Sequence, residues 1–199
     1  MPFPGSWFDD LFEALFYRLL RVEVLENDPE ALLAMGSSKH WGRSVTLADG
    51  TVIRHGDPIA EFHFRRQALR LLDSGSNPRP LGIGLYRLLK RDLPRLAAWV
   101  ARDPRFADIR ALHAISPFHY GAPRIGFEVM DLPTAFSGWC FTVWQRGIMR
   151  RTHPRGAQRL TRHREEPVVS KQVWMSRARL MELWGPGGTL IRQLVERER

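Results

Sequence analysis

The sequence predicts an α+β fold: one domain with an antiparallel sheet of five or more strands and helices packed on one face. Short runs of β-branched and aromatic residues separated by turn signals, above all Asp49-Gly50, predict strands and hairpins. Apolar residues at helical spacing, clearest over residues 85–101, predict helices. The length of 199 residues and the hydrophobic content of 44% fit a single globular domain with its own core.

Residues 1–20 predict an N-terminal amphipathic helix that either docks on the domain or contacts a membrane or a partner. Its apolar residues recur at helical spacing: Trp7, Phe8, Leu11, Phe12, Leu15, Phe16 and Leu19. Residues 21–186 are predicted to form the α+β domain. Residues 187–199, which begin with Gly187-Gly188, are predicted to form a separate C-terminal helix.

The first half of the domain is predicted to be rich in strands. Residues 21–25 predict a strand, and the polar stretch 27–38 predicts an irregular segment or one short helix. Residues 43–54 predict a β-hairpin with Asp49-Gly50 in its turn. The strand that follows, 59–64, is expected to extend this hairpin into an antiparallel meander.

The second half of the domain mixes helices with strands. Residues 65–72 and 85–101 predict helices, and Pro94 should kink or split the second one. Strands over 108–115 and 124–132, with the turn 120–123 between them, predict another hairpin. The remaining expected elements are a helix over 136–149, a strand over 172–175 and a helix from an N-cap at Ser176 to Trp184.

Composition excludes several classes of protein. The single cysteine, Cys140, rules out a disulfide framework and a cysteine-based zinc site, and its place between Trp139 and Phe141 suggests a core residue. No apolar run reaches the length of about 20 residues that a membrane-spanning helix needs. Because acidic residues stand near the N-terminus where a signal peptide has basic ones, we expect a cytoplasmic protein, at most peripheral to a membrane.

Positive charge is concentrated in the second half of the chain. The net charge is +9, and residues 101–199 hold 17 basic and 9 acidic side chains. No acidic residue lies between Asp131 and Glu165. This pattern favours a polyanionic partner, although a general preference for arginine, with 27 Arg against 3 Lys, would also produce it.

Three arginines of that stretch have the spacing of an anion site. Arg155, Arg159 and Arg162 fall on one face if the segment is helical, where their guanidinium groups could hold phosphates. No RNA-recognition, KH, zinc-finger or helix-turn-helix signature accompanies them. Sequence-specific reading of nucleic acid is therefore not expected, and non-specific contact with nucleic acid or an anionic surface stays open.

The candidate catalytic residues are Glu61 and His63, which share one face of the strand 59–64 because strand side chains alternate. A carboxylate beside an imidazole can act as an acid–base pair, or the two can be a buried polar pair or part of a solvated sheet face. Three further residues could line the same cavity as ligand-binding groups: Asp57, His113 and Glu128. No metal-ligand spacing and no nucleotide-binding fingerprint occurs, so neither a metal nor another cofactor is expected.

Several short motifs together resemble the YkoP-like domain family. They are Thr46-Leu47-Ala48-Asp49-Gly50-Thr51, Gly56-Asp57, Glu61-Phe62-His63, Gly126-Phe127-Glu128-Val129, Asp131-Leu132-Pro133 and Val173-Trp174-Met175-Ser176-Arg177. The resemblance covers most of residues 15–186. Relatives in that family occur attached to polysaccharide deacetylase catalytic domains, which implies a link to envelope carbohydrate or lipid metabolism. The histidine and aspartate cluster of a deacetylase is absent from this chain.

Three functions remain open from the sequence. The first is an accessory or ligand-binding domain whose cavity, with Glu61 and His63, takes a small amphiphilic or sugar-like ligand. The second is a small enzyme in which His63 is the general base and Glu61 orients it or acts as the acid. The third is a non-specific binder of nucleic acid or an anionic surface through the arginines between Arg146 and Arg164.

Overall fold

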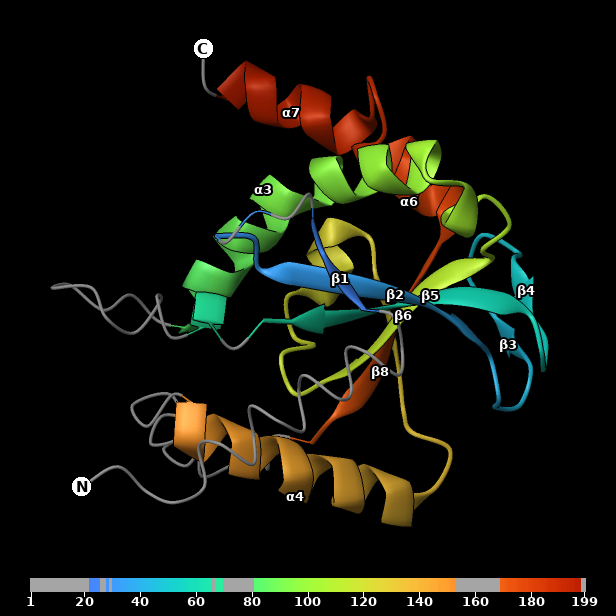
Figure 1. Cartoon of the computed structure of the whole chain (residues 1–199), viewed down its shortest axis with the longest axis vertical. Helices are drawn as coiled ribbons and strands as arrows, with labels where there is room; N and C mark the ends of the chain where they lie inside the picture. The colour runs from blue at the N-terminus through green and yellow to red at the C-terminus, as the bar shows by residue number, and fades with distance from the viewer. Residues whose placement is uncertain are drawn as a thin grey trace, which may run out of the picture.

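The computed structural model describes residues 22–25, 28, 30–65, 67–69, 81–152 and 169–197, so the predicted N-terminal helix over 1–20 lies outside the described residues. Six strands form one sheet in the order β1-β2-β5-β6-β8-β7 (Figure 1). These strands are β1 (Glu23–Val24), β2 (Leu33–Lys39), β5 (Pro58–Phe64), β6 (Ala111–Ser116), β8 (Lys171–Ser176) and β7 (Glu128–Met130). A second sheet has two strands, β3 (Val45–Thr46) and β4 (Val52–Ile53).

The helices that accompany these sheets in the described ranges include α3 (Leu81–Arg102), α4 (Ala135–Thr152), α6 (Arg177–Trp184), α7 (Thr189–Arg197), η2 (Pro104–Phe106) and η3 (Ala122–Ile125), and residues 67–69 are also helical. As predicted, Ser176 caps α6, and its hydroxyl accepts a hydrogen bond from the backbone N–H of Arg179. None of the helices in the described ranges has the length and apolarity needed to cross a membrane.

The sheet is antiparallel except at one pair of strands. β5 and β6 run parallel, whereas every other neighbouring pair is antiparallel. The predicted α+β domain with a mainly antiparallel sheet of at least five strands is therefore confirmed. A parallel pair requires a long crossover between its strands, and α3 lies within that crossover.

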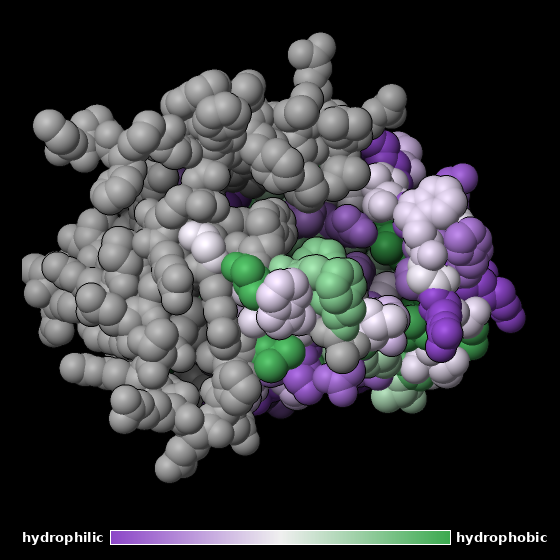
Figure 2. All heavy atoms as spheres, turned by 90° about the horizontal axis from the view of Figure 1, so that it is seen from below, coloured by the Kyte–Doolittle hydropathy of each residue, from purple (hydrophilic) through white to green (hydrophobic). Residues whose placement is uncertain are grey.

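The main core fills the space between the sheet and the helices α3 and α6. Buried side chains of β2, β5, β6 and β8 contribute to it, together with a stripe along α3 that includes Leu93, Leu96 and Val100. α4 lies on the opposite side of the sheet (Figure 1), the side from which Figure 2 views the molecule. The expectation that the helices pack on one face alone is therefore not confirmed.

The prediction for residues 27–38 was wrong, because β2 occupies Leu33–Lys39 and lies between β1 and β5. Leu33, Ala34 and Met35 are fully buried. A strand covered on both faces shows an unbroken apolar run without the alternation of a half-exposed strand. Tertiary burial thus overrides the helix propensity of leucine, alanine and methionine.

Two further expectations were wrong in their connections. β5 does not extend the β3–β4 hairpin into a meander, since it pairs with β2 and β6. The strands β6 and β7 do not form a hairpin, because β8 lies between them and pairs with both.

Pro94 does not split its helix, as α3 runs unbroken through it. The buried apolar stripe of α3 compensates for the one backbone hydrogen bond that a proline removes.

The β3–β4 hairpin is fixed to the far end of the main sheet. Leu47 and Ile53 from the hairpin are buried against Trp174 of β8. The Glu128 carboxylate accepts a hydrogen bond from the backbone N–H of Ala48 at 2.9 Å. The hydroxyl of Ser176 hydrogen-bonds to the carboxylate of Asp49 in the hairpin turn. Apolar packing and two carboxylates together hold the hairpin over this part of the sheet.

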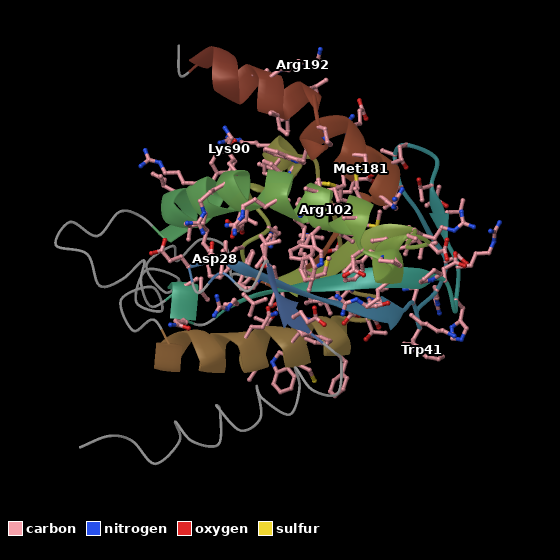
Figure 3. All side chains as sticks on the ribbon, turned by 45° about the horizontal axis from the view of Figure 1, so that its top comes forward. Asp28, Trp41, Lys90, Arg102, Met181 and Arg192 are labelled. Carbon is pink, nitrogen blue, oxygen red and sulfur yellow. The ribbon has the colours of Figure 1, made fainter. Side chains whose placement is uncertain are left out.

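A buried carboxylate joins α3 to the segment that leads into β2. Asp92 is fully buried, and its Oδ2 accepts a hydrogen bond from the backbone N–H of Leu32 at 2.7 Å. Its Oδ1 lies 2.8 Å from Arg91 Nε and 3.6 Å from Arg95 Nη1. Arg95 also contacts Asp28, at 2.8 Å, and Figure 3 labels Asp28 beside α3. These contacts set the position of the crossover helix relative to the sheet.

We expect Asp92→Ala to destabilise the protein by about 2–4 kcal/mol, because it leaves the Leu32 N–H without an acceptor and removes a buried ion pair. Asp92→Asn keeps an oxygen acceptor, so this variant should lose less stability than Asp92→Ala. Urea unfolding followed by circular dichroism measures both. The control Asp108→Ala removes an exposed aspartate and should change stability by less than about 0.5 kcal/mol. Equal losses for Asp92→Ala and Asp108→Ala would contradict the structural role of Asp92.

Candidate functional site

Strand β5 presents Glu61 and His63 on one face of the sheet, as the alternation predicted. On the other face, Ala60 and Phe62 are buried in the main core, and Phe64 packs against it. The apolar residues thus anchor β5 toward α3 and α6. Their anchoring turns Glu61 and His63 toward the opposite side of the sheet.

The strand pairing aligns four side chains in one row across the sheet. Glu61 of β5 pairs with His113 of β6, His113 with Trp174 of β8, and Trp174 with Glu128 of β7. Gly36 of β2 faces Glu61 on its other side and contributes no side chain. Directly opposed residues project to the same face, at about 4.8 Å from strand to strand. The row therefore holds a carboxylate, an imidazole, an indole and a second carboxylate.

Glu61 and His113 form the closest pair of titratable groups in this row. Glu61 Oε1 lies 3.8 Å from His113 Nδ1, which is too long for a hydrogen bond but within range of an ion pair. The Glu61 side chain is 29% exposed and that of His113 is 12% exposed. The carboxylate is thus the part of the pair that solvent or a ligand reaches.

Aromatic contacts fix the plane of the His113 imidazole. Its ring stacks on the indole of Trp174, with centroids 4.0 Å apart and planes 29° from parallel. His40 contacts the same indole edge-on, and its Nε2 lies 2.7 Å from the backbone carbonyl of Arg43. Within the part of the chain that the structure describes, neither ring nitrogen of His113 nor Trp174 Nε1 forms a hydrogen bond. Polar nitrogens are thus concentrated beside Glu61.

The surroundings set the charges of Glu61 and His63. The His113 imidazole lowers the pKa of the Glu61 carboxyl; burial opposes this effect, and His63 adds a smaller favourable one. Burial lowers the pKa of His63, although the nearby Glu61 carboxylate opposes the shift. Near neutral pH, Glu61 is therefore an anion and His63 is uncharged.

Two of the predicted ligand-binding residues serve other contacts. Asp57 lies in the turn before β5, where its Oδ2 accepts a hydrogen bond from the backbone N–H of Arg54 at 2.7 Å. Glu128 belongs to the row, but Trp174 separates it from His113, and its carboxylate holds the hairpin at Ala48. The structure thus brings together Glu61, His63 and His113, and it uses Asp57 and Glu128 to stabilise loops.

Other sequence predictions lie beyond this cluster. Arg155, Arg159 and Arg162, the predicted anion-binding residues, lie outside the described residues. In the described ranges, no group of three His, Cys, Asp or Glu side chains is placed to hold a metal ion. Cys140 is half-buried in α4.

Sequence reasoning missed Trp174 and His40 as members of the site. Trp174 appeared only as one residue of a short strand, and no local pattern indicated that its neighbour would be His113. His113 and Trp174 become neighbours only when β6 pairs with β8, because 61 residues separate them along the chain. An indole in the middle of a predicted strand was the feature available to suggest a stacked partner.

Chemically, this arrangement can bind hydroxyl groups. An ionised carboxylate accepts hydrogen bonds. A ligand hydroxyl can donate one to Glu61, the partly exposed member of the pair. The same groups could exchange a proton with a bound molecule.

Comparison with known proteins connects this chain to one family. Residues 6–184 match the YkoP domain. The chain is also similar to "Uncharacterized protein YkoP" of Bacillus subtilis (strain 168), with 24% identity over 119 residues. That match covers 59% of this chain and 65% of the relative, so slightly less than two thirds of the relative is represented. No solved structure matches this chain.

The domain match spans the whole described sheet together with α3, α4 and α6, and it includes the row from Glu61 to Glu128. The chain therefore belongs to the YkoP domain family.

Proposed function

We propose that this domain is a non-catalytic accessory domain that binds a small hydroxyl-bearing ligand, sugar-like or amphiphilic, through the Glu61 carboxylate, with His113 beside it. The observation that carries the proposal is the partly exposed, ionised carboxylate of Glu61, 3.8 Å from an imidazole whose ring nitrogens have no hydrogen bond in the described chain. A partly exposed, ionised carboxylate can accept a hydrogen bond that a ligand hydroxyl donates.

The arrangement of the three polar side chains supports binding of a neutral ligand over a charged one. Glu61 carries one negative charge and would repel a phosphate or carboxylate, while His63 beside it is uncharged near neutral pH. A sugar hydroxyl gains a charge-assisted hydrogen bond to Glu61 without adding charge to a half-buried site. The resemblance to relatives attached to polysaccharide deacetylases points to the same chemical class of ligand.

The enzyme alternative would use Glu61 to orient His113 in place of His63. In such a pair the base nitrogen must reach the proton that it removes. Both ring nitrogens of His113 are shielded from solvent, and Glu61 is the exposed member of the pair. Binding therefore fits this geometry better than proton abstraction by His113. Turnover of a bound saccharide would instead favour the enzyme alternative over simple binding.

We expect weak binding of simple saccharides to the wild-type protein and its loss in Glu61→Gln. Saturation-transfer NMR with glucose and N-acetylglucosamine detects the binding, and titration gives the dissociation constant. Removing the charge while keeping the shape should weaken affinity about tenfold or more, the usual effect of losing a hydrogen bond to a charged group. Glu182→Gln, on α6, removes an exposed carboxylate and serves as the matched control.

The outcome that counts against the proposal is equal affinity of the wild-type protein and Glu61→Gln for every saccharide that binds. A saccharide that disappears during the titration, with a product appearing in the spectrum, would instead support the enzyme alternative.

A second prediction concerns how the folding stability of the protein depends on pH. Because burial lowers the pKa of His63, the unfolded chain binds a proton below about pH 6.5 that the folded protein does not. Stability should therefore fall as the pH decreases from about 6.5, by up to about 1.4 kcal/mol per pH unit from this group. Glu61, with its lowered pKa, contributes stability above about pH 4.5 and loses it only below that value.

Urea unfolding at about pH 7 and about pH 5 tests this prediction, since only His63 of the pair acts in that window. The loss of stability between the two values should be smaller in His63→Gln than in the wild-type protein. His55→Gln removes an exposed histidine of the turn before β5 and should retain the wild-type loss. An unchanged loss in His63→Gln would contradict the assigned charge state.

A further inference from the structure

Helix α4 presents large apolar side chains to solvent. Phe136 is 74% exposed, Trp139 is 63% exposed and Val143 is 49% exposed. Figure 2, seen from the side of α4, shows green apolar surface among the described residues there. Single exposed apolar residues are ordinary, but a group of them on one helix marks an interaction surface.

These three residues follow one line along the helix, which we call the α4 stripe. They stand at positions i, i+3 and i+7, the spacing of one helical face. Phe136 and Trp139 also contact each other, with ring centroids 6.3 Å apart. Cys140, half-buried, occupies the i+4 position of the same face. The stripe is thus a continuous surface two turns long.

Two polar residues of α4, Thr142 and Gln145, face the protein, which fixes the stripe outward. Thr142 is buried, and its hydroxyl accepts a hydrogen bond from the backbone N–H of Ser170 at 2.9 Å. Gln145 donates to the backbone carbonyl of Ile115 at 2.7 Å and hydrogen-bonds to the hydroxyl of Ser170 at 2.6 Å. A helix that hides polar groups and exposes aromatic ones has the opposite orientation from an ordinary surface helix. Rotation to bury the stripe would break all three contacts.

Positive charge accompanies the stripe. α4 contains no acidic residue, and its last two turns contain Arg146, Arg150 and Arg151. Arg150 follows Val143 by seven residues, so its position continues the line of the stripe. The sequence around the helix, from Leu132 to Arg164, is also free of acidic residues. The helix therefore combines exposed aromatic residues with a basic end.

We propose that α4 docks on the surface of an anionic lipid bilayer, with Phe136 and Trp139 at the boundary between headgroups and acyl chains. Helices that lie in that boundary combine aromatic and aliphatic residues with basic ones. Basic groups next to anionic headgroups strengthen the attachment. This inference goes beyond the proposed ligand site and does not depend on it.

Two other occupants fit the α4 stripe less well than a bilayer. A second copy of α4 on a two-fold axis would place arginines against arginines, because a symmetric interface repeats the same patch. Single-stranded nucleic acid could stack on the two aromatic rings and neutralise the arginines. It would gain little from Val143, whereas a bilayer takes up every apolar member of the stripe.

The single cysteine gives a direct readout of the docking. A polarity-sensitive fluorophore attached to Cys140 should shift to the blue when the protein meets vesicles with about 30% phosphatidylglycerol in phosphatidylcholine. Brominated lipids should quench it. The same vesicles without phosphatidylglycerol should bind the protein at least about tenfold more weakly, since part of the attachment is electrostatic.

Co-sedimentation of unlabelled variants then separates the stripe from general surface properties. Phe136→Ser with Trp139→Ser should weaken vesicle binding about tenfold or more, and so should Arg150→Glu with Arg151→Glu. Matched controls come from α3, on the opposite side of the sheet, where Figure 3 labels Arg102. Ile83→Ser removes an exposed apolar residue, and Arg87→Glu with Arg102→Glu reverses two charges. Both controls should bind like the wild-type protein.

Three results would overturn the proposal. They are no binding to the anionic vesicles, equal loss of binding in the α3 controls and the α4 variants, and tighter binding of a single-stranded oligonucleotide than of the vesicles. A blue shift that persists in Phe136→Ser with Trp139→Ser would also count against it, because the apolar stripe would then contribute nothing.

Discussion

Parallel strands cannot be joined by a tight turn, so the pairing of β5 with β6 forces the chain to leave the sheet, cross one face as α3 and return. This pairing sets Glu61 opposite His113. The buried carboxylate of Asp92 holds the crossover helix at the start of β2. The candidate site thus depends on contacts made on the other side of the sheet.

The face of the sheet that carries the site is divided between two kinds of packing. Toward the hairpin, Trp174 is fully buried under Leu47 and Ile53, and two carboxylates anchor the hairpin there. Toward β5, the row continues into His113 and the partly exposed Glu61. The indole therefore serves as a rigid support on which the imidazole stacks. Rigid support keeps a binding group in place at little entropic cost.

The features that depend on local pattern could be predicted from the sequence. Alternation placed Glu61 and His63 on one face, and the serine before a helical stretch predicted the cap at Ser176. Pairing could not be predicted, because β8 inserts between β6 and β7 through contacts that no short window contains. For the same reason His63 was the predicted partner of Glu61, whereas the structure places His113 at 3.8 Å from it. Strand β2 was not predicted from the sequence, because a strand that is buried on both faces lacks the alternation of apolar and polar residues.

Glu61 and α4 lie on the same side of the sheet, because Phe62 and the other core residues of β5 point toward α3 and α6. A bilayer that contacts the α4 stripe would therefore lie on the side of the molecule to which Glu61 projects. An amphiphilic ligand with a hydroxyl-bearing headgroup could then reach the carboxylate while its apolar part remained in the membrane. A free sugar gains no such advantage from α4. The relative affinity for a soluble saccharide and for the same headgroup in a vesicle thus distinguishes two independent surfaces from one composite surface.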